Sequence, residues 1–271
     1  MSAQTSMPAQ MAPLPSFRLR VRYAKRGRLA YLGHLEVIHT IERAVRRAAM
    51  PYAVSQGFSP HMRVGFTSAL PVGTSSSCEW FDLFLTDLVP APEALRRLCA
   101  ASAPDLMPDL AGYIDLRTPA LTAEITRVGY RIELVPAPGR SYGTESVRAA
   151  LESIRARQCI PYQRGKKAKE LDLEKTLLGF TVVGEPCSLL ILTLDTLCDN
   201  EGSLRPEILL AALDQELTRC DDPIVSTGIQ NLVSFERYRV ERIYQKIVLE
   251  DGSLADPLDV SSASVARVVE P

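Results

Sequence analysis

The heptapeptide FRLRVRY, Phe17–Tyr23, alternates apolar and basic side chains without interruption. Because successive side chains of a β-strand point to opposite faces, this pattern predicts a strand with one apolar face and one basic face. The apolar face must pack against helices, so we expect the opposite face of the sheet to be open and to carry Arg18, Arg20 and Arg22. A basic turn follows the strand and contains Lys25, Arg26 and Arg28.

Segments downstream of this strand predict the same order of elements twice. In the first half we expect a helix at 34–49, strands near 52–67 and 78–86, a helix from 92 to about 101 and a strand near 111–117. In the second half we expect a strand at 128–135, a helix at 144–158, strands at 162–173 and 188–196, a helix at 205–218 and a strand at 233–243. The order β-α-β-β-α-β is that of the ferredoxin-like fold. We therefore predict an α+β protein of two tandem ferredoxin-like units, with antiparallel sheets and helices on one face.

Two similar segments support a duplication of this unit. ERAVRRAAMPY, which begins at Glu42, and ESIRARQCIPY, which begins at Glu152, share Glu, Arg, Pro and Tyr at matching positions. We assign the first unit to 17–120 and the second to 125–245. Residues 1–16 are expected to form a disordered N-terminal tail, and 246–271 a flexible C-terminal tail.

Charge is unevenly distributed along the chain, whose 271 residues have a net charge of −1. Between Phe17 and Arg63 there are ten basic residues and only two acidic ones. A basic segment of this kind favours an anionic partner for the first unit. The alternative is a solvated surface whose charge is balanced by the acidic remainder of the chain.

Missing motifs disfavour several classes of protein. The six cysteines form no C-x-x-C pair, and neither a phosphate loop nor a dinucleotide-binding glycine motif occurs. The three histidines, His34, His39 and His61, lack the spacing of a metal site, so we expect no metal and no other cofactor. The longest apolar run, 187–194, is too short to span a membrane, and the first residues do not form a signal peptide. We therefore expect a cytoplasmic protein.

Nucleic-acid binding is the function that these patterns favour. Trp80, Asp82 and Phe84 are expected beside the arginines, where guanidinium groups would contact phosphates and aromatic rings would stack on bases. The alternative is that this face packs against the second unit or against another protein. Further basic candidates lie on the first helix and in a loop of the second unit, at Arg43, Arg47, Lys166, Lys167 and Lys169.

A set of short motifs in the first half has a characteristic order: LGHLE at 32–36, RAVRRA at 43–48, VSQGFSPHM at 54–62 and ALPVG at 69–73. Together they resemble the radical-SAM-linked protein family, an uncharacterised bacterial family. KELD at 169–172 and RPEIL at 205–209 in the second half are also similar to it. Gly33, Glu36 and Met62 depart from the serine, aspartate and proline usual in that family.

The resemblance implies a partner rather than a reaction. Members are encoded beside, or fused to, a radical SAM protein with a cobalamin-binding-type region, so this chain would present a substrate to such an enzyme. We expect that substrate to be tRNA or rRNA, and we expect neither DNA nor a membrane as a partner. The loop at 54–63 would then offer RNA its polar and aromatic side chains, namely Ser55, Gln56, Phe58, His61 and Arg63. Its alternative is a bent strand with Phe58 in the core.

Two other functions are open on these observations. A metal-independent endoribonuclease of the ferredoxin-like type would use His34 as its catalytic residue, with Tyr31, Lys25 or Arg28 beside it. A protein–protein scaffold would bind its partner without any affinity for RNA.

Overall fold

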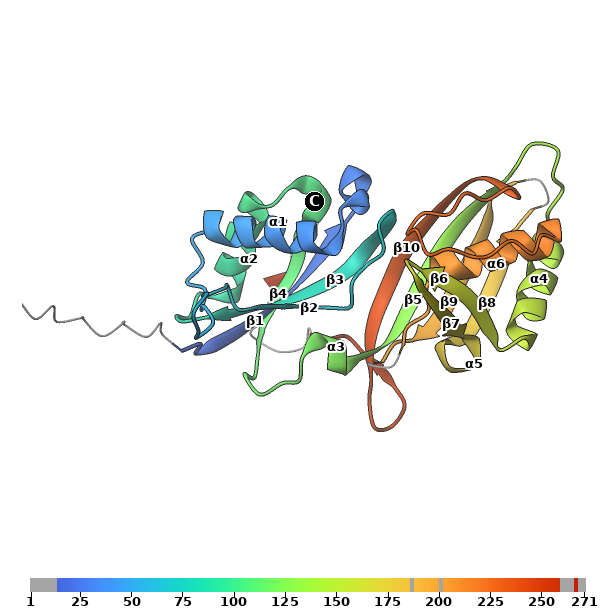
Figure 1. The fold of residues 1–271 in the computed structure, drawn as a ribbon. Coiled ribbons are helices and arrows are strands. Elements are labelled where there is room, and N and C mark those ends of the chain that lie inside the picture. The colour runs from blue at the N-terminus through green and yellow to red at the C-terminus, as the bar shows by residue number, and fades with distance from the viewer. Residues whose placement is uncertain (1–13, 186–187, 200–201, 259–265, 268–271) are drawn as a thin grey trace, which may run out of the picture.

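A computed structural model describes residues 14–185, 188–199, 202–258 and 266–267 of the chain. It shows a mixed α+β structure with one large, mostly antiparallel sheet and helices packed against it (Figure 1). The predicted N-terminal tail lies outside the described residues except for 14–16, and so does much of the predicted C-terminal tail.

The first half of the structure follows the predicted order of elements. It contains β1 (Phe17–Lys25), the short 3-10 helix η1 (Gly27–Tyr31), α1 (His34–Arg47), β2 (Val64–Phe66), β3 (Thr74–Leu85), α2 (Ala91–Ala101), η2 (Pro104–Leu106) and β4 (Pro108–Ile114). The strands β4, β1 and β3 are neighbours in that order, and β2 pairs antiparallel with β3. The expected strand at 52–67 is therefore mostly irregular, because only Val64–Phe66 forms a ladder.

The second half contains more strands than the sequence predicted. It runs through α3 (Leu121–Glu124), β5 (Ile125–Pro136), α4 (Thr144–Ala156), β6 (Cys159–Arg164), β7 (Lys167–Asp172), α5 (Leu173–Thr176), β8 (Leu177–Gly184), β9 (Leu190–Leu197), α6 (Pro206–Thr218) and β10 (Phe235–Val248). The prediction of one strand at 162–173 is wrong, because residues 159–172 form a separate two-stranded sheet of β6 and β7. The strand that joins the main sheet beside β9 is β8.

The two halves share one continuous sheet, in the order β4-β1-β3-β10-β5-β9-β8. The link is a short parallel pairing of β3 with β10, from Val240 opposite Thr74 to Arg242 opposite Ser76. Beside it, the buried guanidinium of Arg242 donates to the carboxylate of Glu79 on β3 at 3.1 Å. The strand pairing and this ion pair therefore fix the junction between the halves. The sequence did not predict this junction.

Two apolar cores pack against this sheet. In the first half, Leu19 and Val21 of β1 pack with apolar side chains of α1 and α2, as the alternation in FRLRVRY predicts. In the second half, Ile132 of β5 packs among side chains of α4, α6 and β9. Helices α1 and α2 therefore cover the first half of the sheet, and α4 and α6 cover the second half (Figure 1).

Residues assigned to a flexible C-terminal tail are ordered up to residue 258. β10 pairs with β5 as far as Ile247, and β11 (Leu254–Ala255) pairs back onto β10. Leu258 is buried in the second core, and β12 (Ala266–Arg267) pairs with β4 of the first half. The end of the chain thus returns to cover the sheet near its beginning.

The arginine face, which comprises Arg18, Arg20 and Arg22, has the predicted neighbours. In the register of β1 and β3, Arg18 lies opposite Phe84, Arg20 opposite Asp82 and Arg22 opposite Trp80. The expectation that this face is open is wrong, because Arg18 is only 5% exposed and Arg20 only 1%. Trp80, expected to stack on bases, is 1% exposed and belongs to the second core.

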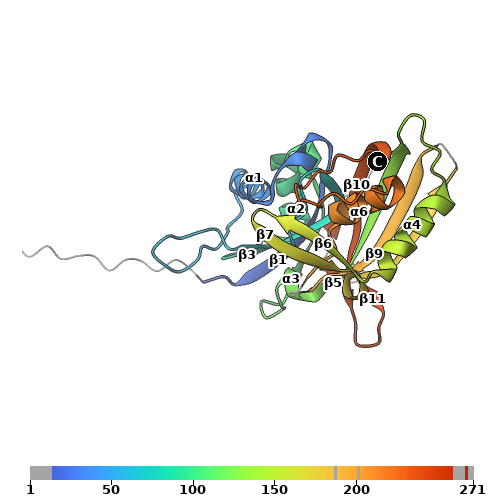
Figure 2. The same ribbon diagram turned by 45° about the vertical axis from the view of Figure 1, so that its right-hand side comes forward.

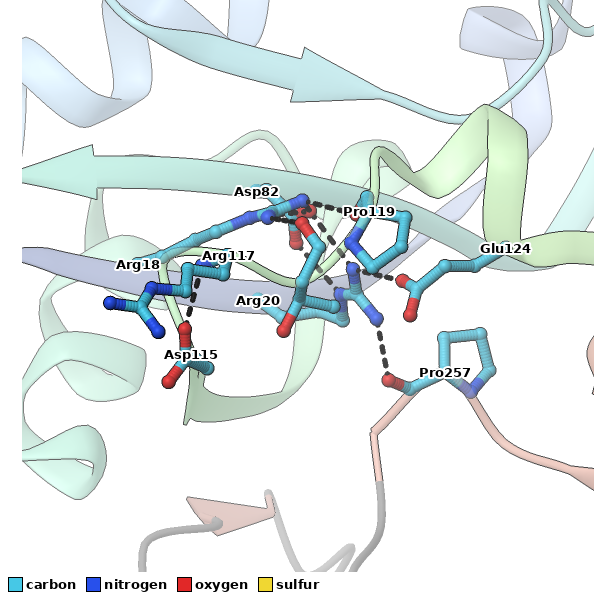
Figure 3. Close-up of polar contacts among 9 residues, drawn as sticks. Arg18, Arg20, Asp82, Asp115, Arg117, Pro119, Glu124 and Pro257 are labelled. Carbon is cyan, nitrogen blue, oxygen red and sulfur yellow. Dashed lines mark hydrogen bonds and ion pairs between the residues drawn. The ribbon is translucent and has the colours of Figure 1, made fainter.

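One buried carboxylate holds the two inner arginines. Asp82 accepts hydrogen bonds from Arg18 at 2.7 Å and from Arg20 at 2.8 Å. The segment before α3 and the C-terminal segment close over these charges, as Figure 3 shows. Arg18 donates to the carbonyl groups of Thr118 and Pro119, and Arg20 to the carboxylate of Glu124 and the carbonyl of Pro257. These two guanidinium groups can be buried because each of their nitrogen atoms donates to an acceptor within the chain.

We expect Asp82→Asn to lower the free energy of unfolding by about 3–5 kcal/mol, because it leaves buried guanidinium groups without their shared counter-charge. Urea unfolding followed by circular dichroism measures this change. The matched control is Asp109→Asn, which removes the partly exposed partner of Arg22 and should cost no more than about 1 kcal/mol. Equal losses in the two variants would contradict the structural role of the Asp82 cluster.

Candidate nucleic-acid interface

A hollow of about 700 Å³ lies where the two halves meet, and we call it the junction groove. One wall is η1 with Gly73 and Ser75 at the start of β3. The other wall consists of residues on the face of β5 and β10 that points away from the helices. Its charged and aromatic lining residues are Arg26, Arg28, Tyr31, Arg131, Glu133, Arg239 and Glu241.

Cationic groups dominate the junction groove, since four arginines line it against two glutamates. Arg131 is paired with Glu133 at 2.6 Å. Arg26, Arg28 and Arg239 are exposed, and no side chain in the described part of the chain forms an ion pair with them. The groove therefore has unneutralised positive charge from both halves of the protein, which attracts anionic ligands.

An aromatic side chain stands at the rim of the junction groove. Tyr31, the last residue of η1, is 63% exposed. Gly73 beside it has a φ of +84°, and a Cβ there would lie 3.0 Å from Cγ1 of Ile229. The amide of Gly73 also donates to the carbonyl of Ala30 at 3.0 Å. The glycine of ALPVG is thus required where the first half meets the loop before β10.

A second, smaller hollow of about 220 Å³ adjoins the groove, and we call it the Glu207 pocket. Tyr31, Gly73 and Val240 line both hollows. Val72 and Thr74 of the first half also line it, and the rest of the pocket wall comes from the 228–232 loop, the first turn of α6 and the start of β10. Glu207 and Tyr238 are two of its ionisable lining residues, and burial raises the pKa of each.

The basic loop predicted in the second half comprises the turn of the β6–β7 hairpin and the start of β7. Lys166, Lys167 and Lys169 are all exposed there. Figure 2 shows this hairpin as a ribbon apart from the main sheet. The amide of Gln163 donates to the carbonyl of Ile224 at 2.8 Å, and Ser226 donates back to Gln163 at 2.8 Å. The hairpin is thus attached to the loop that continues into the Glu207 pocket.

Residues 18–206 match the model of a family described as an uncharacterised protein conserved in bacteria, DUF2344. The chain belongs to this family. No curated protein matches the chain.

The DUF2344 match covers only part of the junction groove and of the Glu207 pocket. It includes η1, the ALPVG motif and Arg131, whereas Glu207, Tyr238 and Arg239 follow the matched residues. The radical SAM partner expected from the resemblance stays a prediction.

None of the helices in the described ranges has the length and apolarity needed to span a bilayer.

The VSQGFSPHM loop of this DUF2344 protein projects from the first half. Phe58 is fully exposed, so the alternative that it fills the core is wrong. Ser55 accepts a hydrogen bond from the amide of His61 at 3.0 Å, which closes the loop. Arg63 lies over the ring of Phe84 at 4.7 Å and is half-buried. His61 and Gln56 are exposed, and none of the five candidates in this loop lines the junction groove.

The helix candidates are also separate from the groove. Arg43 and Arg47 are exposed on α1, where Arg43 donates to Thr40 at 2.9 Å and Arg47 to the carbonyl of Ala101 at 2.7 Å. Neither lines the junction groove or the Glu207 pocket. They remain a basic helix surface of the kind expected for any solvated helix.

The catalytic residues considered for a ribonuclease are divided between two places. His34 and Lys25 line a hollow of only about 10 Å³ together with Glu79, whereas Tyr31 and Arg28 line the junction groove. Lys25 is buried and donates to the carbonyl of Leu32 at 2.9 Å. The space beside His34 holds about one water molecule and no nucleotide. Among the described residues, no three histidine, cysteine or carboxylate side chains are grouped to ligate a metal.

Sequence reasoning missed half of the groove because its arginines come from the second half. Arg131 lies on the first strand of that half, where one arginine close to a glutamate gives no signal of a site. Arg239 lies next to Glu133 only through the register of β10 with β5. Alternation in 237–243 marks two faces of a strand, but it does not show that one face meets η1.

Burial lowers the pKa of Lys25 to about 8, whereas an unfolded lysine titrates near 10.4. Between these pH values the unfolded state binds more protons, so this residue makes stability rise with pH. We expect Lys25→Met to remove that rise in urea-unfolding curves between about pH 8 and pH 10.4. Parallel pH profiles for the variant and the wild type would show that Lys25 keeps an ordinary pKa in the folded state.

Proposed function

We propose that this DUF2344 protein binds single-stranded RNA in the junction groove, as a non-catalytic adaptor that presents the RNA to an enzyme. The observation that carries the proposal is the set of exposed arginines from both halves around Tyr31. Guanidinium groups are suited to phosphates, and an exposed tyrosine offers a face on which a base stacks. The enzyme would be the radical SAM protein expected from the family resemblance, and its co-purification with this chain from bacterial cells tests that part.

The strand orders support a finer account of the fold. We propose that each half is a ferredoxin-like unit, with β4-β1-β3-β2 in the first and β10-β5-β9-β8 in the second. In this account the inserted β6–β7 hairpin is an addition to the second unit. Joining the units through β3 and β10 would place the loops of both beside one groove.

The buried arginines do not compete with the groove for RNA. Arg18 and Arg20 spend their donors on Asp82, Glu124 and carbonyl groups of the chain. A phosphate would have to displace these partners and unfold the covering segments. Arg28 and Arg239 present no such barrier, since they are already in contact with solvent.

We expect the double variant Arg28→Ala/Arg239→Ala to weaken binding of a fluorescein-labelled, mixed-sequence RNA strand in anisotropy titrations. Each lost phosphate contact lowers the slope of log affinity against log salt by about 0.7 on single strands, so the slope should fall by about 1.4. The matched control Arg43→Ala/Arg96→Ala removes two exposed arginines outside the groove and should leave the slope near that of the wild type.

Two results would contradict the proposed function. The first is that the wild-type protein binds no RNA at low salt. The second is that the control double variant loses as much affinity as the groove variant, which would mean that binding follows total charge rather than the groove.

A further inference from the structure

The Glu207 pocket contains a buried acceptor that nothing in the described chain uses. Glu207 is 4% exposed, in the first turn of α6. Its Oε1 is 3.4 Å from the guanidinium of Arg205, whereas its Oε2 is buried without a hydrogen-bond partner. Leaving a buried carboxylate oxygen unpaired is costly, so such an oxygen on a side chain that lines a hollow indicates a missing donor.

The shape of the pocket limits what can bring that donor. Its volume of about 220 Å³ is below the range of about 300–1,000 Å³ typical of drug-sized ligands. Tyr31 and Tyr238 both line it, and the hydroxyl of Tyr238 accepts from the amide of Gln230 at 2.7 Å, which fixes that side chain. A small flat ring with donors on one edge fits these walls.

We propose that the Glu207 pocket receives a guanine base of the RNA whose backbone lies in the junction groove. This inference rests on the proposed function and adds its base specificity. The shared lining residues Tyr31, Gly73 and Val240 connect the two hollows. Phosphates would stay among Arg26, Arg28 and Arg239 while one base turns past Tyr31.

Hydrogen-bond chemistry selects guanine among the four bases. A carboxylate has two adjacent acceptors and no donor. The Watson–Crick edge of guanine has two adjacent donors, the N1 imino group and the N2 amino group. Adenine and cytosine place a ring acceptor beside their single amino group, and uracil places its imino group between two carbonyls. Those acceptors would face the Glu207 carboxylate and repel it.

The electrostatic environment of Glu207 is consistent with binding of guanine. Burial raises the pKa of Glu207 above its ordinary value, which shows that the carboxylate lacks sufficient compensation in the free protein. Two donors from one base would supply it. Of the other carboxylates, Glu236 also lines the pocket but is exposed, so it keeps its hydration and needs no ligand.

The test uses three labelled RNA pentamers that differ only at the central base: AAGAA, AAIAA with inosine, and AAAAA. Inosine keeps the N1 imino group of guanine and lacks the N2 amino group. A carboxylate that pairs with both donors should favour guanine over adenine by about tenfold or more, with inosine between them. Anisotropy titrations with the wild-type protein, Glu207→Gln and Glu236→Gln measure the three affinities.

We expect Glu207→Gln to bring the three affinities within about twofold of one another and to keep the salt dependence, since the groove arginines are unchanged. Glu236→Gln should keep the preference for guanine. Glu207→Gln also removes a buried charge without changing the shape of the side chain, so its urea midpoint should be no lower than that of the wild type.

Each other outcome overturns a defined part of the account. Equal affinities of the wild type for the three pentamers, with normal loss of binding in Arg28→Ala/Arg239→Ala, would overturn the guanine pocket alone. No binding of any pentamer would overturn the proposed function and the pocket together. Binding of guanosine monophosphate as tight as that of AAGAA would assign the pocket to a free nucleotide and overturn the role of the groove.

Discussion

The ion pairs of Asp82 with Arg18 and Arg20 determine how the rest of the chain is arranged. Two guanidinium groups on the helix-free face of β1 need a counter-charge and further acceptors before they can be buried. Asp82 supplies the charge, and the remaining acceptors come from α3, the segment before it and the C-terminal segment. The connection between the halves and the end of the chain are therefore fixed against the first half of the sheet.

This arrangement moves the accessible basic surface from the sheet face to the junction. Because the arginine face is covered, the exposed arginines at the junction of the halves are those in and beside η1 and on β10. The parallel pairing of β3 with β10, supported by the buried pair Glu79–Arg242, holds these elements at a fixed distance. A groove made by two halves can contact more of an extended RNA strand than either half alone, which suits an adaptor.

The sequence predicted the elements better than their contacts. Alternation in FRLRVRY correctly separated Leu19 and Val21 from the arginines, and Asp82 was correctly expected on the arginine face. It could not show that Glu124 and Pro257, about one hundred and more than two hundred residues away, would cover them. The repeated order of elements predicts one strand of the main sheet at 162–173, whereas this segment lies in the β6–β7 hairpin, most of whose side chains are exposed. Glu207 follows Pro206 at the start of α6, where an acidic residue is ordinary, so only the three-dimensional structure shows its unpaired oxygen.

Ultraviolet cross-linking of bound RNA, followed by mass spectrometry of the attached peptides, tests most directly whether RNA lies at the junction. The account predicts that nucleotides attach to peptides containing Tyr31 and to the 225–240 segment with Tyr238, and that an excess of unlabelled RNA suppresses both. Attachment confined to the Phe58 loop, to α1 or to the lysines of the β6–β7 turn would contradict it, because those surfaces lie outside the junction groove.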